Sequence, residues 1–474
     1  MKLYEAFAEE IAQSIRAGVM KRGDRLPSVR QASTSRGVSP STVFEAYYLL
    51  EARGLIRARD RSGYYVTAGA RAHLPEPGIG LRPDGDSTAI DVSELVFDIL
   101  ESTRMRDVVP FGSAFPSPLL FPLPRLARSM ASSVQAMDPW STVDDLTPGN
   151  AGLRRQIALR YLADGMSVHT DEIVITNGAL EALNLCLHAV ARPGDAVIIE
   201  SPAFYGALQA LEGFGVRAIQ VATHPRDGIE LAELAAALER HAPKACWLMT
   251  NFQNPMGSLM SDQKKQALVE LLAAHDVPLI EDDVYGELYF GSKRPLPAKA
   301  YDKKGLVMHC SSFSKSLAPG YRVGWAVPGR FTRDVSRLKL TRTLSASAPA
   351  QAAIADYLAK GGYDKHLRQL RHALSMQQEA MLQAIERHFP AGTRATRPDG
   401  GYFLWVELPG HPDTIEIHRQ ALSLGISVAP GPMFSAQRRF ANCLRLNYGH
   451  PWDARAEAAM ATLGRLVAAV SGQA

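Results

Sequence analysis

The sequence contains little cysteine and no long apolar run. Its 474 residues include four widely separated cysteines, Cys186, Cys246, Cys310 and Cys443. This spacing excludes a disulfide framework and a CxxC metal site, so we expect no bound metal and a reducing, cytoplasmic environment. No stretch approaches the roughly 18 uninterrupted apolar residues of a membrane span, and the N-terminus lacks the apolar segment of a signal peptide.

The chain also has little net charge, but the charge is unevenly placed. Lys and Arg number 52 against 48 Asp and Glu, which leaves +4. Residues 1–68 hold 11 basic and 7 acidic residues, so the whole excess lies in this short segment. Hydrophobic residues make up 46% of the chain, which excludes disorder over most of it. The local excess of positive charge indicates an anionic partner for residues 1–68.

Residues 1–68 predict a small unit of three helices and a hairpin. The first helix spans 4–17, and a second begins after Ser28, a natural N-cap. Ser39 caps a third helix over 40–53, where a proline at the first helical position costs no hydrogen bond. Two short strands then join around Ser62-Gly63. Helix, turn, helix and hairpin is an arrangement that places one helix in the major groove of DNA.

The side chains of this unit suit phosphate contact. Short hydroxyls at the start of the third helix donate to phosphate oxygens, and arginines add charge nearby and along the hairpin. A helical docking module with a solvated cationic face is the alternative. The candidate side chains are Arg25, Arg30, Ser39, Ser41, Thr42, Arg57, Arg59 and Arg61.

Several segments carry a family resemblance. Leu26-Pro27-Ser28-Val29-Arg30, Gly37 to Val43 and Gly63-Tyr64-Tyr65-Val66 resemble the winged helix-turn-helix of GntR-type regulators. The sequence departs from that pattern at Pro40 and Phe44, where many relatives carry arginine, so we expect phosphate contacts to carry more of the affinity. The resemblance implies that DNA is contacted by Arg25, Ser28, Arg30, Ser41, Thr42 and the Gly63 wing.

Beyond this unit the composition changes twice. Residues 69–90 are rich in Pro, Gly and Asp and predict a linker. Apolar strands then alternate with helices, which predicts an α/β domain over 91–330 with a parallel sheet covered on both faces. A smaller α+β lobe is predicted over 331–474. The expected strands are 173–176, 196–199, 245–250, 278–280, 306–309, 401–408, 426–429 and 443–447.

One lysine of the large domain has unusual neighbours. Lys315 follows an apolar strand and is crowded by serines and by Arg322. An aldehyde cofactor needs a lysine for a Schiff base, and its phosphate needs donors close by. Pyridoxal phosphate is such a cofactor, and it also needs an acid that keeps its pyridine nitrogen protonated. Asp282, after another strand, suits that role, and Asn254 could hydrogen-bond the oxygen on the ring. Gly178-Ala179 opens a helix whose free N–H groups favour phosphate.

Each of these residues also has an ordinary structural explanation. Asp282 suits a helix cap, Asn254 a turn, Arg322 a surface ion pair and Gly178 a loop. Their common position after successive strands favours the cofactor site. The order resembles that of fold-type I aminotransferases over about residues 105–470, with Ser-x-Ser-Lys and Asn-Pro-x-Gly as the strongest segments.

The aminotransferase resemblance implies a role for each site residue. Lys315 forms the Schiff base with pyridoxal 5'-phosphate, Asp282 pairs with the pyridine nitrogen, and Arg445 binds a substrate carboxylate unless it pairs with an acid instead. Phe204 stacks on the ring, with Tyr205 as a competitor. Ring-oxygen and phosphate contacts fall to Asn254, Tyr285, Ser312, Ser314, Arg322, Gly178 and Ala179.

Two departures from the aminotransferase pattern bear on cofactor affinity. Ala179-Leu180 stand where aminotransferases often carry Ser, Thr or Gln, and no tyrosine lies near 144–148 for a neighbouring subunit to contact. A weaker phosphate site is therefore expected, while Lys315 keeps its role.

The two resemblances together cover essentially the whole chain. A winged helix-turn-helix followed by a fold-type I aminotransferase domain resembles the MocR subgroup of GntR regulators. They imply a homodimeric regulator of double-stranded DNA that senses an amino acid or amine by forming an aldimine in place of Lys315. An active cytoplasmic aminotransferase with an accessory DNA-binding domain is the alternative.

Overall fold

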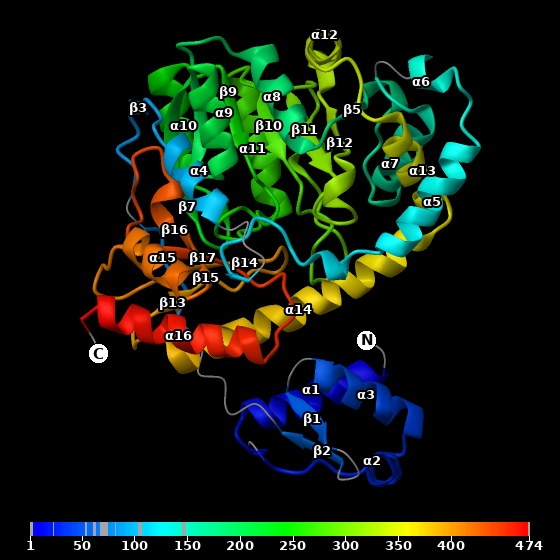
Figure 1. The fold of residues 1–474 in the computed structure, drawn as a ribbon, viewed down its shortest axis with the longest axis vertical. Coiled ribbons are helices and arrows are strands. Elements are labelled where there is room, and N and C mark those ends of the chain that lie inside the picture. Colours follow the sequence, from blue (N-terminus) through cyan, green and yellow to red (C-terminus); the bar gives the residue numbers. More distant parts are fainter. Residues whose placement is uncertain are drawn as a thin grey trace.

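The computed structural model describes most of the chain. The described residues are 3–21, 23–52, 55–59, 63–66, 74–80, 82–102, 107–144 and 148–472. Figure 1 shows a small N-terminal unit and a much larger α/β body. Among the helices described, none is long and apolar enough to cross a membrane.

The N-terminal unit has the predicted elements. Its helices are α1 (Leu3–Arg16), α2 (Val29–Arg36) and α3 (Pro40–Ala52), followed by the antiparallel strands β1 (Ile56–Arg59) and β2 (Gly63–Val66). Ala8, Val43, Tyr47 and Leu50 are fully buried between the helices. Gly37 ends α2 with φ +66°, a left-handed conformation that glycine adopts without strain and that turns the chain into α3.

The body is built on one mixed sheet. Its strand order is β3-β7-β6-β9-β10-β11-β12-β5, with β8 paired to β7. The strands are β3 (Ser87–Thr88), β5 (Val174–Thr176), β6 (Ala196–Ser201), β7 (Arg217–His224), β8 (Gly228–Ile229), β9 (Ala245–Leu248), β10 (Leu279–Asp282), β11 (Val307–Ser312) and β12 (Gly324–Val327).

The prediction of a parallel sheet holds for the centre and is wrong for three strands. β12 runs antiparallel to both β11 and β5, and β3 and β8 both run antiparallel to β7. Only residues 313–323, with the 3-10 turn Pro319–Tyr321, connect β11 to β12. A parallel return normally needs a crossover of a dozen or more residues, usually a helix, so the chain turns back here.

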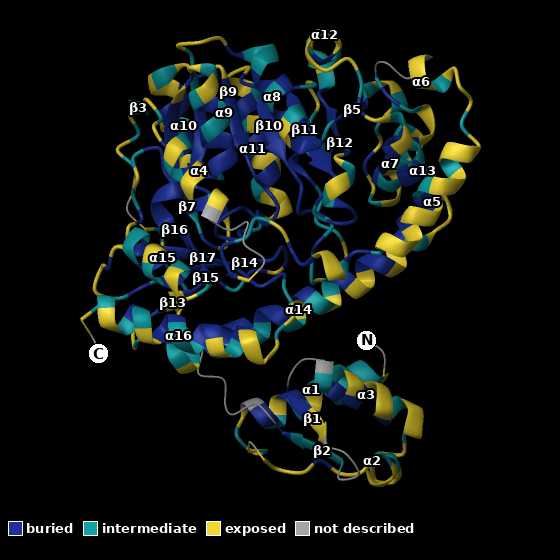
Figure 2. Ribbon diagram, in the orientation of Figure 1, coloured by how far each residue is buried: buried dark blue, intermediate teal, exposed yellow. Residues whose placement is uncertain are grey.

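Helices cover both faces of this sheet (Figure 2), because alternate strand residues point to opposite sides. Val197 and Ile199 pack in the core beneath α8 and α9, whereas Ile198 packs in the core with α10 and α11. The helices of the body are α4 (Ser93–Ser102), α5 (Leu123–Gln135), α6 (Ser141–Asp144), α7 (Ala151–Ala163), α8 (Ala179–Val190), α9 (Tyr205–Phe214), α10 (Leu231–His241), α11 (Asp262–Ala274), α12 (Thr332–Arg342) and α13 (Ala348–Ala359).

The small lobe follows the long helix α14 (Gly362–His388). Its antiparallel sheet has the order β13-β14-β17-β16, and β15 pairs in parallel with β4. The remaining elements are β4 (Val109–Pro110), β13 (Arg394–Ala395), β14 (Phe403–Glu407), β15 (Ile426–Ser427), β16 (Ala429–Pro430), β17 (Cys443–Asn447), α15 (Thr414–Ser423) and α16 (Ala454–Val470).

Contacts in the structure differ from the predicted domain boundaries. Part of the predicted linker, Ser87–Thr88, is strand β3 of the main sheet, and Pro75 accepts a hydrogen bond from the backbone of Ala395 at 3.0 Å. Helices α12 and α13, predicted for the small lobe, pack on α8, α5 and α7 of the body. The Pro, Gly and Asp composition predicted a linker, but Arg226–Glu76 and Arg240–Asp86 ion pairs connect this segment to the body.

Candidate functional site

A cavity of about 370 Å³ lies where the central strands of the sheet end at their carboxyl termini. The cavity wall contains predicted residues from Ala179 to Arg322, which are about 140 positions apart in the sequence. The predicted residues among the lining are Ala179, Phe204, Asn254, Asp282, Tyr285, Ser312, Ser314, Lys315 and Arg322. The strand-end positions that the sequence indicated therefore meet at one site, as the edge of a parallel sheet requires.

Lys315 supplies an amine at the cavity wall. Its Nζ donates to the backbone oxygen of Ala114 at 3.0 Å and lies 3.7 Å from the centre of the Phe115 ring. Desolvation and the positive charge of Arg445 lower the Lys315 pKa from 10.5 to about 7. A large fraction of this amine is therefore neutral near pH 7, which is the nucleophilic form.

Asp282 is a buried carboxylate with an unused oxygen. It is 1% exposed, and its Oδ1 has no hydrogen-bond partner among the described residues. Burial and the neighbouring Asp283 raise its pKa to about 7. Because a buried unpaired carboxylate oxygen is costly, a cationic N–H donor from a bound ring matches this atom.

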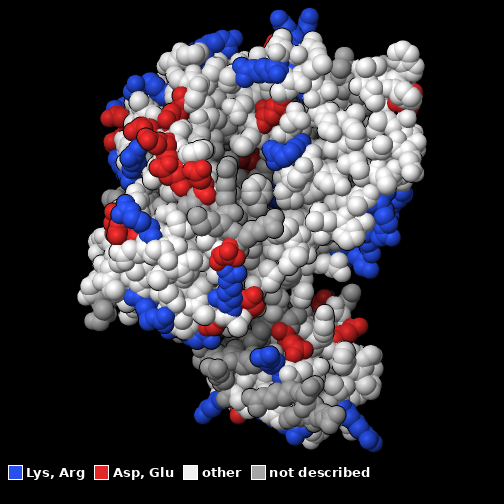
Figure 3. All heavy atoms as spheres, viewed as in Figure 1, with Lys and Arg blue, Asp and Glu red and all other residues white. Residues whose placement is uncertain are grey.

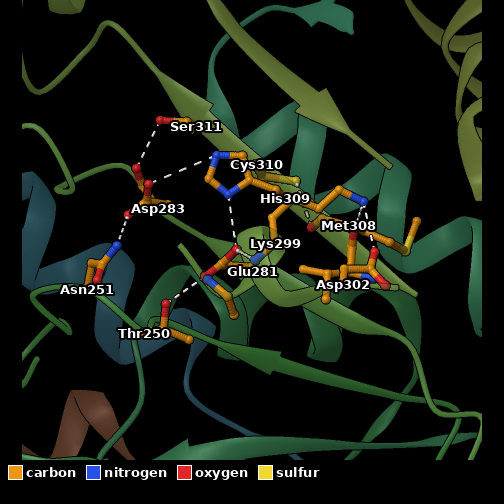
Figure 4. Close-up of polar contacts among 12 residues, drawn as sticks. Thr250, Asn251, Glu281, Asp283, Lys299, Asp302, Met308, His309, Cys310 and Ser311 are labelled. Carbon is orange, nitrogen blue, oxygen red and sulfur yellow. Dashed lines mark hydrogen bonds and ion pairs between the residues drawn. The ribbon is translucent and has the colours of Figure 1, made fainter. Parts of the chain in front are cut away.

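The carboxylates on either side of Asp282, Glu281 and Asp283, are satisfied by polar contacts of their own (Figure 4). Glu281 accepts hydrogen bonds from Thr250 at 2.6 Å and pairs with His309 at 3.1 Å. Asp283 accepts from Asn251 at 2.9 Å and from Arg294 at 2.6 Å. Strand alternation points Asp282 the other way, toward the cavity, so it differs from its two neighbours in having capacity for a ligand.

A cradle of donors forms beside the N-terminus of α8. Gly178, with φ +83°, precedes this helix without a side-chain cap, and a Cβ there would collide with the Arg322 guanidinium. Arg322 donates to Ser314 Oγ at 3.3 Å, and the Ser314 backbone N–H donates to Ser312 Oγ at 3.3 Å. Hydroxyls, a guanidinium and helix N–H groups at one point fit a phosphate group.

Arg445 is completely buried on β17 of the small lobe. It donates to the backbone oxygens of Gly112 and Ser113 at 2.8 and 3.1 Å and to Asn254 Oδ1 at 3.3 Å. Within the described residues it has no acidic partner, and its Nε has no hydrogen bond. The alternative of a strand arginine paired with an acid is therefore wrong. Arg445 does not itself line the cavity, but Ser113 and Asn254, which it contacts, do.

The two aromatic residues that compete for the cofactor ring, Phe204 and Tyr205, have different surroundings. Phe204 and Tyr205 both line the cavity. The Tyr205 ring packs on Phe434 and lies 5.9 Å from the Arg445 guanidinium, which leaves Phe204 as the candidate for stacking. Tyr285 stands at right angles to Tyr402, with ring centres 5.3 Å apart, and burial raises its pKa.

The sequence did not predict half of the residues in the cavity wall. The loop Ser113-Ala114-Phe115 supplies the backbone acceptor for Lys315, but it contains no motif and lies some 200 residues away in the chain. Further lining residues absent from the prediction are Leu100, Leu180, Leu183, Gly206, Gln209, Met249 and Val284. Apart from Gln209 these are apolar or small, and only their tertiary position distinguishes them from core residues.

In the N-terminal unit, the predicted hydroxyls cap helices. Ser28 Oγ accepts from the backbone of Gln31 at 3.2 Å, and Ser39 Oγ accepts from the backbone of Thr42 at 3.1 Å. Ser39 also exchanges hydrogen bonds of 2.8 Å with the hydroxyls of Ser41 and Thr42. These serines therefore shape the helix ends in addition to any contact with DNA.

The predicted cationic side chains are exposed where the structure describes them. Arg25 and Arg30 face solvent, and Arg25 lies against Gly63, whose φ is +100°. Figure 3 shows Lys and Arg side chains projecting from the lower edge of this unit. Residues 60–62 at the wing tip and the side chain of Arg59 lie outside the described residues.

The fold and the two sites define a two-part protein, with a winged helix-turn-helix unit and an aminotransferase-type domain in one chain. The chain belongs to the aminotransferase class I and II family, whose family model matches residues 122–461, and its N-terminal unit to the gntR family of bacterial regulatory proteins, which matches residues 3–66. This combination confirms the predicted MocR-type organisation.

Two relatives match this chain over almost its full length, so the match includes both parts. The HTH-type transcriptional regulator YdcR of Escherichia coli is 48% identical over 98% of this chain and 99% of its own. YjiR of the same organism is 38% identical over 98% and 99%. The crystal structure of LysN, the alpha-aminoadipate aminotransferase of Thermus thermophilus, complexed with N-(5'-phosphopyridoxyl)-L-leucine, has a TM-score of 0.73 at 29% identity over 80% of this chain and 95% of its own.

Proposed function

We propose that this protein is a DNA-binding transcriptional regulator whose large domain binds pyridoxal 5'-phosphate and an amino acid or amine. The carrying observation is the cavity that joins the Lys315 amine to the unpaired Asp282 oxygen, in a chain that begins with a winged helix-turn-helix. YdcR and YjiR, which match nearly the whole chain, bear the names of transcriptional regulators and favour this function over catalysis alone.

The residues present fit the cofactor. When bound, pyridoxal phosphate supplies an aldehyde for amines and a ring that withdraws electrons. Lys315 is the amine that binds it covalently, and Asp282 holds the proton at the ring nitrogen. Asn254 and Tyr285 orient the ring oxygen, and Phe204 covers the ring face. The phosphate is bound by Ser312, Ser314, Arg322 and the N–H groups at Gly178-Ala179.

The effector site joins the two lobes. Arg445 belongs to β17 of the small lobe, and Lys315 follows β11 of the body. A guanidinium binds a carboxylate through two parallel hydrogen bonds, so an amino acid held between Arg445 and the Lys315 position draws the lobes together. With the cofactor bound, its aldehyde would be the group that both the Lys315 amine and the effector amine bind, and a free Lys315 Nζ would serve as a proton acceptor.

A homodimer acting on two DNA half-sites follows from this function. Large apolar side chains exposed around α5 and α6 support it, since Trp140 is 70% exposed and Val143 50%. DNA as the partner requires the cytoplasm as the working compartment.

A second candidate function is an active aminotransferase. It is favoured by one observation, the Lys315 amine with a pKa near 7, which is the range of a general base. The two functions share the cofactor site and differ in whether turnover or DNA binding is the output.

The deciding experiment measures both outputs on one preparation of the full chain. The probe DNA is the duplex that the protein enriches from a random pool, and affinity for it is measured with and without each of the common amino acids. We expect sequence-specific binding that at least one amino acid alters, with slow or no transamination. Turnover with several amino acids and no sequence-specific complex would overturn the regulator function.

A further inference from the structure

The second helix of the helix-turn-helix carries aromatic side chains on its outer face. Phe44 is 55% exposed and Tyr48 63%, whereas Val43 and Tyr47 on the inner face are fully buried. Neither Phe44 nor Tyr48 belongs to the core of the N-terminal unit or to its partly buried periphery. Phe44 and Tyr48 are four positions apart, so they lie side by side on one face of α3.

This face is built for DNA rather than for another apolar surface. It begins at the Ser39–Ser41–Thr42 hydroxyl cluster, and the exposed Arg30 of α2 precedes it in the motif. Charges and donors of this kind flank a helix that lies between phosphate strands. Glu45, also exposed on α3, repels phosphates but accepts hydrogen bonds from base edges, which directs the face into the groove.

The chemistry of α3 limits how it can distinguish bases. From Pro40 to Ala52 the helix contains no lysine or arginine, so it cannot make the paired arginine–guanine contact. In the major groove, the feature that an apolar ring recognises is the C5-methyl group of thymine.

We infer that Phe44 is a specificity-determining residue that recognises thymine through this methyl group, with Tyr48 extending the apolar surface by one turn. The inference rests on the proposed DNA-binding function and adds to it the base that is recognised. The exposed face of α3 therefore contacts the major-groove edge of a thymine-containing base pair in duplex DNA.

The test changes the methyl group on the DNA and the ring on the protein. In the duplex that the full-length protein enriches from a random pool, each thymine is replaced singly by deoxyuridine, which lacks only the methyl group. We expect one or two positions in each half-site where this replacement raises Kd about three- to tenfold. Phe44→Ala should raise Kd by a similar factor and should no longer respond to deoxyuridine at those positions.

Two further variants complete the cycle. Phe44→Leu keeps an apolar contact and should retain part of the response. Val19→Ala removes an apolar side chain that is 75% exposed and belongs to the loop between α1 and α2, and it should leave both affinity and response unchanged.

Three outcomes overturn the inference. If deoxyuridine has no effect while specific binding persists, the regulator function stands and methyl recognition by Phe44 fails. If Phe44→Ala leaves DNA affinity intact and instead shifts the oligomeric state, Phe44 contacts a second copy of the chain. If the protein enriches no sequence, the proposed function fails together with the inference.

Discussion

The two candidate binding regions of this protein place their charged side chains in opposite ways. In the N-terminal unit, arginines and hydroxyls lie on the surface around buried apolar residues such as Val43 and Leu50. In the large domain, Arg445 and Asp282 are themselves buried, and each has a polar atom without a partner in the described part of the chain. One region presents charge to solvent and the other holds charge in the interior.

The difference follows from the size of the ligand. A duplex is too large to enclose, so the unit that binds it uses exposed charges whose contribution is spread over many contacts and weakened by salt. A small ligand can be enclosed, and a few buried groups then interact strongly because little water screens them. Single substitutions should therefore have large effects in the cavity and smaller effects on the DNA-binding face.

The largest effect is expected for Lys315→Ala. Without the amine, the full-length protein incubated with pyridoxal phosphate should lose the visible absorption band of the bound cofactor entirely. DNA affinity in the absence of effector should change by less than about twofold, since the DNA-binding unit is untouched. Lys304→Ala, which removes an exposed lysine whose Nζ donates to Ala273, is the matched control and should keep the band. A band that persists in Lys315→Ala would assign cofactor attachment to another lysine.

An intermediate effect is expected for Arg445→Lys. The substitution keeps the positive charge and removes the planar fork, so affinity for α-amino acids should fall about a hundredfold. Affinity for amines without a carboxylate should stay within about threefold, and the cofactor band should remain. Titration of the effector-dependent change in that band measures both classes of ligand. An equal loss for both classes would mean that Arg445 supports the fold and does not bind the carboxylate.

The smallest effect concerns pH and separates the two regions most cleanly. The Lys315 pKa is lowered to about 7, so its neutral fraction rises as the pH rises through that value and falls about tenfold per unit below it. The Asp282 pKa is raised to about 7, so its charged form is also favoured above it. The rate at which the apo-protein acquires the cofactor band should therefore increase from about pH 6 to 8.

DNA affinity should change far less over the same range, because arginine stays charged throughout it. A cofactor rate that rises only above about pH 9 would indicate an ordinary lysine and contradict the buried environment.

The local chemistry of the site could be predicted because each residue lies in a short motif. Lys315 lies among serines after a strand, and Asp282 ends the preceding strand, so both the residue type and the position in a parallel sheet were visible. The acceptor for Lys315 was not visible: Ala114 contributes a backbone oxygen, and any residue type supplies one. The identity of Ala114 therefore contains no signal.

The strand topology was also partly predictable from local sequence patterns. Apolar strands alternating with helices indicated a parallel sheet, and its centre is parallel. The antiparallel direction of β12 depends on a short connection without a crossover helix, and β3 depends on pairing with β7 far along the chain. The composition of residues 69–90 indicated a linker because proline and charge are typical of one, although ion pairs hold part of it on the body.

The sequence by itself determined the two-part organisation, the helix-turn-helix and the set of side chains able to bind a phosphorylated aldehyde, because these depend on local patterns of residue type. Tertiary structure alone decided that, among the residues the structure describes, Asp282 keeps an unpaired oxygen, Arg445 has no acidic partner and Phe44 remains uncovered. These properties depend on which atoms distant segments bring near, and burial and hydrogen bonding are set by that proximity.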